Sequence, residues 1–461
     1  MSRIVFWLLL GTVLLSPVPF GAIFPWSYTL LALLVGVLVL VWSTTLLVAG
    51  APPPVTLRMI ALPAALFAAV IGWALVQASP WTPGAWHNPV WAETAKGLGA
   101  DVQGYISVVP YTTETSVMRL LTYAGIFWLA LQFGRSGERA RQVFYAVAMA
   151  GLAYAAYGLI VDLTGAQTIL WYDKETYKDN LTSTFRYKNA YATYAGMGLI
   201  CTTALLVRAL AREDFTRMGP RERLRSVLLL IFERSTYLLL AFILIASALL
   251  LSDSRGGFLA AILSMIVFAG ALWRGRNLKL PYGKSSVAVM VGAGAVFIAI
   301  SGGTVLDRLG ESVGDNQRAR IYAQTMDAIA ERPLRGWGLG SFESVFAKYQ
   351  DAGFDKRVAR AHNEYLDNAL GLGIPAAAAL VLAIALIALR CLRGSITRQR
   401  DAYYPAAGFA IAVFAGIHSL VDFTLQVPAV AATFALLLGT CCAQSWSSLV
   451  RRIARTGTRT S

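Results

Sequence analysis

The chain has little of the charge that a large soluble protein carries. Only 14% of its 461 residues are Asp, Glu, Lys or Arg, whereas 57% are hydrophobic and the mean hydropathy is +0.58. In soluble domains about a quarter of all residues are charged. The composition therefore excludes a large soluble enzyme. It indicates an all-α integral membrane protein, because recurrent apolar runs of about 20 residues are typical of membrane-spanning helices.

Cysteine, histidine and the common catalytic motifs are also scarce. The four cysteines lie in or beside apolar runs without Cys-x-x-Cys spacing, which argues against a disulfide framework or a zinc site. No Asp-x-Asp or paired-carboxylate motif indicates a metal-dependent sugar-nucleotide transferase or a glycosidase, and no Walker loop is present. We expect no cofactor and no metal site. The cysteines are Cys201, Cys391, Cys441 and Cys442.

Apolar runs of spanning length recur along the chain. The first run could instead be a signal peptide, but no clear small-residue cleavage site follows it. The runs after Tyr237 and before Gly302 are the shortest. We predict about twelve transmembrane helices, near 4–20, 27–50, 58–79, 116–134, 142–163, 190–210, 237–252, 256–273, 286–302, 374–390, 404–421 and 428–449.

The placement of Lys and Arg predicts the orientation of these helices. With both termini in the cytoplasm, most basic residues fall on the cytoplasmic side, including the connections at 208–234, 274–284 and 390–400. The pI of 9.8 then reflects membrane orientation, and we expect no nucleic-acid partner, because no soluble module carries a basic face. The predicted location is the bacterial inner membrane.

The longest predicted periplasmic loop is the polar segment 303–373. Ile321, Met326 and Ile329 recur near helical spacing between Gln317 and Glu331, and Pro333 ends this run. Gly336, Gly338 and Gly340 follow, which indicates tight turns or a close approach of the backbone. A second helix is expected over 361–372. A loop of this length in a compact protein is usually functional.

We divide the chain by these features into three parts. Residues 1–181 form the N-terminal transmembrane helices. Residues 182–449 form a catalytic membrane region that includes the loop 303–373. Residues 450–461 form a basic cytoplasmic tail.

Several cations stand on the predicted periplasmic side, where the orientation rule disfavours them. Each could snorkel to the interface or form an ion pair, for example Asp253 with Arg255. Taken together they fit a phosphate group, because Arg binds phosphate through a bidentate fork and Lys supplies a point charge. The cluster would suit a pyrophosphate on a lipid carrier. Its members are Arg186, Lys188, Arg255, Arg318 and Arg320.

His362 is the candidate general base, because imidazole can accept a proton near neutral pH. Glu364 and Asp367 are near enough in sequence to orient it, although residues two apart on a helix face apart. His362 could also be an ordinary surface histidine. We interpret His87 as incidental, and His418 as either a packing contact or part of the site.

Four motifs resemble the bacterial O-antigen ligase and polymerase superfamily. Thr184-Phe-Arg-Tyr-Lys-Asn189 is similar to Thr-Phe-x-Asn-Arg-Asn, with Lys188 in place of arginine and Tyr187 in place of asparagine. Ser254-Arg255-Gly-Gly257 matches a Ser-Arg-Gly turn. The other two motifs are Arg318-x-x-Ile-Tyr322 with Pro333, Gly336, Gly338 and Phe342, and Ala361-His-Asn-Glu-Tyr-Leu366 with Leu372-Gly-Ile-Pro375. The resemblance covers about 182–439.

The resemblance implies a GT-C-like fold and a metal-independent, inverting membrane glycosyltransferase with its active site facing the periplasm. Lys188, Arg255 and Arg318 would hold the diphosphate of an undecaprenyl-pyrophosphate-linked glycan donor, with Arg186 and Arg320 as further candidates. His362 would deprotonate the acceptor hydroxyl while the cations stabilise the leaving diphosphate. Supporting positions are Asn363, Glu364, Tyr365, His418 and Asp422.

The acceptor is left open at this stage. A polymerase would extend a lipid-linked repeat unit, a ligase would modify lipid A–core, and a protein hydroxyl is a third option. The pattern His418-Ser-Leu-Val-Asp422-Phe is similar to one in members from exopolysaccharide loci and favours a polymerase slightly. The alternative from another class is a flippase or transporter of lipid-linked oligosaccharides. A transporter would place its ionisable residues midway along the spans, whereas here they gather at one face.

Overall fold

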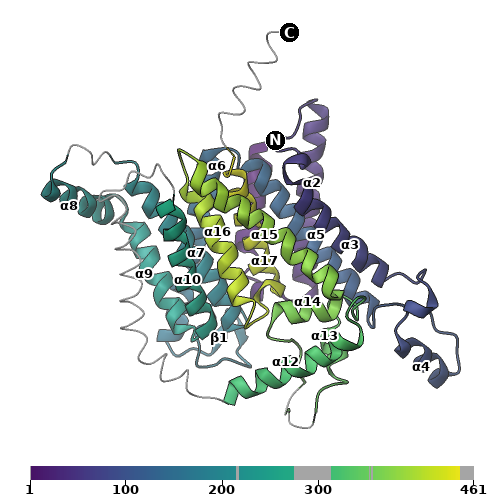
Figure 1. The fold of residues 1–461 in the computed structure, drawn as a ribbon. Coiled ribbons are helices and arrows are strands. Elements are labelled where there is room, and N and C mark those ends of the chain that lie inside the picture. Colours follow the sequence, from purple (N-terminus) through teal and green to yellow (C-terminus); the bar gives the residue numbers. More distant parts are fainter. Residues whose placement is uncertain (1, 214–217, 275–312, 352–353, 355–356, 447–461) are drawn as a thin grey trace.

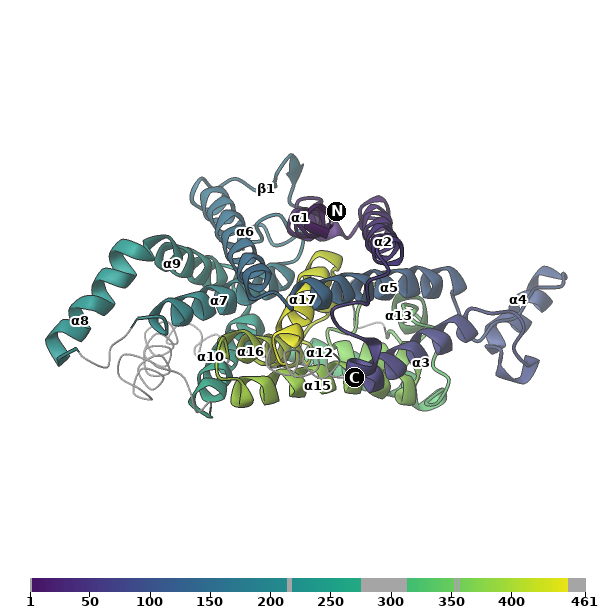
Figure 2. The ribbon, with the colours of Figure 1, turned by 90° about the horizontal axis from the view of Figure 1, so that it is seen from above.

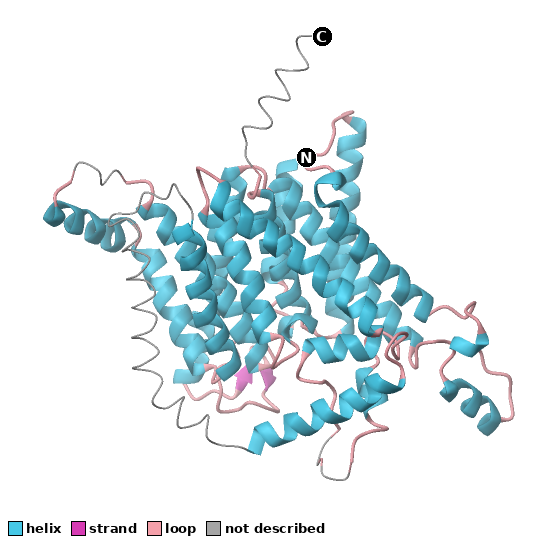
Figure 3. Ribbon diagram, in the orientation of Figure 1, coloured by secondary structure: helices cyan, strands magenta, loops and turns pink. Residues whose placement is uncertain are grey.

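The computed structural model describes residues 2–213, 218–274, 313–351, 354 and 357–446. Almost all regular structure in these ranges is helical (Figure 3). The exception is a short antiparallel pair formed by β1 (Thr168–Ile169) and β2 (Tyr172–Asp173). The predicted all-α class is therefore confirmed. The predicted span 286–302 and the predicted tail 450–461 lie outside the described residues.

Within the described ranges, seven helices are long and apolar enough to cross a membrane, and each coincides with a predicted span. They are α2 (Pro25–Val48), α3 (Ala61–Gln77) with the short η2 (Leu57–Ile60) before it, α5 (Pro110–Phe133), α6 (Gly137–Leu163), α7 (Lys188–Leu210), α10 (Arg255–Arg274) and α15 (Ile374–Thr397).

Four further predicted spans are shorter apolar helices. They are α1 (Ser2–Leu15), α9 (Thr236–Leu251), α16 (Tyr403–His418) and α17 (Pro428–Ala443). The structure supports a multi-pass membrane protein, and the count of twelve remains a prediction.

The remaining helices are short or lie at the two ends of the bundle. They are α4 (Pro89–Leu98), α8 (Pro220–Leu229), α12 (Val313–Glu331), α13 (Phe342–Phe346), α14 (Glu364–Leu372) and the single turns η1 (Phe20–Ala22), η3 (Gly84–Trp86), η4 (Leu230–Arg234) and η5 (Thr424–Gln426).

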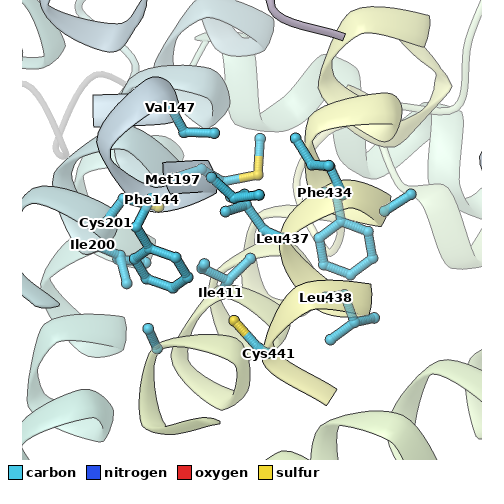
Figure 4. Close-up of a cluster of buried hydrophobic side chains, with 14 of the residues drawn as sticks. Phe144, Val147, Met197, Ile200, Cys201, Ile411, Phe434, Leu437, Leu438 and Cys441 are labelled. Carbon is cyan, nitrogen blue, oxygen red and sulfur yellow. The ribbon is translucent and has the colours of Figure 1, made fainter. Parts of the chain in front are cut away.

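The core of the bundle forms around α7 and α17, which are buried along almost their whole length. Seen from above, α17 lies between α5 and α16, and α7 lies beside α6 and α9 (Figure 2). Side chains from α6, α7, α16 and α17 meet there, among them Phe144, Met197, Ile411 and Leu437 (Figure 4). Small residues let the helices approach closely, since a Cβ on Gly196 would lie 2.3 Å from the Phe414 ring.

Helices α12, α13 and α14 pack together below the bundle in the view of Figure 1, at the end where α16 finishes and α7 begins. The two helices expected within 303–373 are thus present, although the side of the membrane is untested. Pro333 follows α12 as predicted. The glycine turn after it packs against α14, because a Cβ on Gly336 would lie 2.3 Å from the Gly371 carbonyl oxygen.

The glycine turn is fixed to the N-terminal helices by a buried glutamine at the end of α3. Gln77 Nε2 donates to the carbonyls of Arg335 and Gly371 at 2.6 and 2.8 Å, and its Oε1 accepts from the Leu339 amide at 3.3 Å. The fully buried Gln77 therefore joins residues that are far apart in sequence and positions the segment that leads to His362.

Candidate active site

His362 stands immediately before α14, in a strained backbone conformation. Its φ is +52°, a left-handed value that is uncommon for residues other than glycine and often marks functional sites. Asn363 caps the helix, because its Oδ1 accepts from the amides of Tyr365 and Leu366 at 3.0 and 3.1 Å. The surrounding hydrogen bonds maintain the strained conformation, since Tyr322 Oη donates to the His362 carbonyl at 2.8 Å.

The motif that carries His362 is also tied to the end of α16. Asn363 Nδ2 donates to the Leu420 carbonyl at 2.9 Å, and Tyr365 Oη donates to the Gly416 carbonyl at 2.8 Å. Glu364 accepts from the Leu425 amide at 3.2 Å. The predicted supporting residues Asn363, Glu364 and Tyr365 therefore hold the loop against the bundle.

The imidazole of His362 faces a buried carboxylate. Its Nδ1 lies 3.6 Å from Oδ1 of Asp422, and the side chain of Asp422 is only 3% exposed while that of His362 is 31% exposed. Burial raises the pKa of Asp422, but the interactions with His362 and His418 outweigh burial and leave this pKa below its ordinary value. The carboxylate is thus charged at neutral pH and can orient the Nδ1–H tautomer. The Phe423 ring packs against the imidazole at 5.2 Å between centroids.

His418 lies deeper than His362 and joins three helices. Its Nδ1 is 2.8 Å from Thr193 Oγ1 on α7, and its ring is packed by α10, where a Cβ on Gly257 would lie 3.2 Å from Cε1. His418 is 1% exposed. These contacts place the start of α10, and hence the Ser254-Arg255 turn, beside the His418–Asp422 segment.

Lys188 begins α7 and lies at the same end of the bundle. Its Nζ is 3.3 Å from Oδ2 of Asp253, in the turn before Arg255. Tyr187, the residue before Lys188, packs on Phe423 with 5.7 Å between ring centroids. Phe423 in turn packs against the ring of His362. Asp253, the acidic partner of Lys188, therefore lies immediately before the Ser254-Arg255-Gly turn.

Arg318 on α12 contributes a third cation to this region. Burial raises the pKa of Tyr177, Asp422 raises it further and Arg318 lowers it, so Asp422 and Arg318 both lie within electrostatic reach of Tyr177. Tyr177 also lies 5.8 Å below Lys188 Nζ. The structure thus gathers Lys188, Arg255 and Arg318 around the segment that holds Asp422.

Arg186 and Arg320 are directed into separate ion pairs. Arg186 Nη2 lies 2.6 Å from Glu175 and stacks on Tyr172 at 5.4 Å. Arg320 pairs with Asp351 and stacks on Phe354 at 4.8 Å. These ion pairs hold the two guanidinium groups at Glu175 and Asp351, and a donor contact by Arg186 or Arg320 remains a prediction.

Some residues of the site had no sequence signal of their own. Tyr177 and Thr193 reach the cluster only through the packing of the loop and of α7. Tyr322 belonged to a motif, but its role as an anchor of the His362 carbonyl depends on the fold. Among the described residues no group of three His, Cys, Asp or Glu side chains could hold a metal ion. The cations can bind an anion, and His362 beside them can accept a proton.

Residues 240–381 match the family model described as O-antigen ligase. This match confirms the resemblance to the O-antigen ligase and polymerase superfamily, and it includes the segments that carry Arg255, Arg318 and His362. It supports a membrane glycosyltransferase of this general type that acts in polysaccharide biosynthesis. Lys188, His418 and Asp422 lie outside the matched residues. No curated protein matches the chain.

Proposed function

We propose that the protein transfers a glycan from an undecaprenyl-pyrophosphate carrier to a hydroxyl of a saccharide acceptor at the periplasmic face of the inner membrane. The observation that carries the proposal is the convergence at one end of the bundle of the His362–Asp422 pair with Lys188, Arg255 and Arg318. A base beside an anion site is what glycosyl transfer from a diphosphate requires.

The cations would act on the leaving group. Lys188, Arg255 and Arg318 come from three helices, so they can contact the diphosphate oxygens from different directions. Negative charge on the diphosphate grows as its bond to the anomeric carbon breaks. Fixed positive charges stabilise that growth, because they are already in place in the transition state. This role requires no metal ion.

His362 would act on the acceptor. With Nδ1 directed to Asp422, Nε2 carries the lone pair that accepts the hydroxyl proton. The acceptor oxygen then bonds to the anomeric carbon as undecaprenyl pyrophosphate departs with the bonding electrons. A single displacement inverts the anomeric configuration. Asp422 is a positioning residue in this scheme, comparable in role to the carboxylate that orients a catalytic histidine in hydrolases.

The acceptor that we favour is a lipid-linked repeat unit of a surface polysaccharide, which makes the protein a polymerase. This preference over ligation to lipid A–core depends on the His418 to Asp422 pattern, in which His418 lies beside α10 and Asp422 faces His362. A flippase is the less favoured alternative, because the ionisable groups gather at one end of the bundle.

Replacement of His362 tests the proposal. We expect His362→Ala to insert and fold as the wild type does but to lose transfer by at least ~10²-fold, the lower end of what a general base contributes. The assay is a reconstituted reaction with a lipid-linked donor, offered a lipid-linked repeat unit and lipid A–core in parallel. His87→Ala is the control, since His87 contacts Thr82 at 3.1 Å in another segment. Wild-type transfer by His362→Ala would refute the assignment of the base.

A further inference from the structure

A cavity of about 720 Å³ lies between α3, α5, α15, α16 and α17. These helices are labelled in Figure 2. The catalytic candidates His362, Asp422, Lys188, Arg255 and Arg318 do not line it. It therefore differs from the site described above. Its volume is within the range of pockets that enclose most of a bound small molecule.

The cavity is amphipathic along its length. One end is lined by apolar side chains alone, such as Leu57, Ile60, Phe409 and Leu438. The polar lining residues gather at the other end, where α5 begins, α14 lies and α16 finishes. A ligand that fits this distribution has a long apolar chain and a polar or charged head. The polar end is also the end at which His362 stands.

Two arginines and two carboxyl groups form the polar end, which we call the mouth cluster: Arg119, Arg360, Glu364 and Asp367. The four are close enough to interact, since both arginines act electrostatically on Asp367. Arg119 lies over Tyr28 at 5.3 Å and 3.5 Å from Ser116 Oγ. Among the described residues neither arginine forms an ion pair with a carboxylate, and Asp367 Oδ2 is buried without a hydrogen bond.

Burial shifts the charge balance of the mouth cluster toward positive. Burial first, and then Asp367, raises the pKa of Glu364 to about 8, and burial raises the pKa of Asp367. Glu364 therefore tends to hold a proton at neutral pH, and the shift of Asp367 acts in the same direction. The arginines then present positive charge to the cavity, which suits a phosphate group.

We infer that this cavity binds the lipid anchor of the glycan acceptor, with its apolar chain between α3, α5, α15 and α17 and its phosphate at Arg119 and Arg360. The inference rests on the proposed function. Glu364, Tyr365 and Ser419 line the cavity and adjoin His362 or the end of α16, so a sugar attached to the phosphate would start beside the base. The donor cations lie on α7, α10 and α12, which do not line the cavity. Two lipids could thus bind from different helices and meet at His362.

The test is direct photo-crosslinking to the full chain in nanodiscs of zwitterionic lipid, with no glycan transfer involved. The probes are a photoactivatable polyprenyl diphosphate, a photoactivatable acylated glucosamine disaccharide phosphate, and a photoactivatable neutral diacylglycerol. We expect an anionic probe to label peptides of α3, α5, α15 or α17. Labelling there should fall at least tenfold in Arg119→Gln/Arg360→Gln and persist in Arg255→Gln/Arg318→Gln and in the control Arg221→Gln, since Arg221 is an exposed residue on α8.

The anionic probe that labels the cavity identifies the acceptor. Labelling by the polyprenyl diphosphate supports a lipid-linked repeat unit, and labelling by the acylated disaccharide supports lipid A–core. Equal labelling by the neutral probe, or labelling that the Arg119→Gln/Arg360→Gln change leaves intact, overturns the inference. If that happens while transfer still depends on His362, only the cavity assignment fails. If His362→Ala retains transfer, the proposed function fails independently of the cavity.

Discussion

The structure gives Asp422 a role that the sequence alone did not indicate. From the sequence it was a supporting position four residues after His418, and in the fold it faces His362 across 3.6 Å while almost fully buried. A buried carboxylate beside an imidazole selects a tautomer, and this selection determines which ring nitrogen can act as a base. The pairing joins two segments about sixty residues apart, which no local pattern could predict.

The variant Asp422→Asn should show whether Asp422 orients His362 for catalysis or only supports the fold. We expect kcat to fall by about 10²-fold with little change in KM for the donor, because the diphosphate cations are unaltered. Steady-state transfer kinetics would check the split. Asp422→Glu should restore part of the rate, since it keeps the charge. A parallel loss of folding and of donor affinity in Asp422→Asn would instead indicate a purely structural role.

The raised pKa of Glu364 predicts the direction in which the stability of the folded protein changes with pH. Its pKa is raised to about 8 from an ordinary value of 4.5, so between these values the folded protein binds more protons than the unfolded chain. Stability must then fall as pH rises through this window and level off above pH 8. Thermal unfolding in detergent should show Glu364→Gln less pH-dependent than the wild type and more stable at pH 9. The exposed Glu93→Gln serves as control, and identical pH profiles of Glu364→Gln and the wild type would contradict the prediction.

At the scale of elements, the glycine turn between α12 and α13 leaves no room for an added side chain. Gly338 has a φ of +104°, and a Cβ there would lie 2.0 Å from Ser107 Oγ. We expect Gly338→Ala to destabilise the protein by ~1 kcal/mol or more, because the strain and the clash act together. Thermal unfolding measures it. Gly36→Ala is the control, since Gly36 is inside α2 with open space around it; comparable Tm values for both variants would refute the argument.

The elements themselves were largely predictable, because hydrophobic runs of spanning length leave few alternatives in a membrane. The helix from Val313 to Glu331, its end before Pro333 and the three glycine turns followed from periodicity and from backbone chemistry. The ion pairs of Arg186 with Glu175 and of Arg320 with Asp351 did not, because a cation's partner depends on tertiary contacts. The cavity was equally hidden. Its lining is assembled from helices that are far apart in sequence.

For the whole molecule, the untested property is orientation. All four native cysteines are buried, so they should not react with an aqueous maleimide, and single introduced cysteines can report each side. With both termini in the cytoplasm, Ala92→Cys should react with a membrane-impermeant maleimide applied from the periplasm. Gln399→Cys should react only after the membrane is permeabilised. Labelling of Gln399→Cys in sealed cells would reverse the predicted topology and place His362 on the cytoplasmic side.

The left-handed backbone at position 362 has a conformational cost. Glycine would occupy that conformation without penalty, whereas histidine stores strain there that the bonds from Tyr322 and Asn363 must hold in place. A relaxed backbone at this position would be more stable but would turn the imidazole away from Asp422. The bend thus exchanges stability for a fixed orientation of the ring, as is common at sites that carry out chemistry.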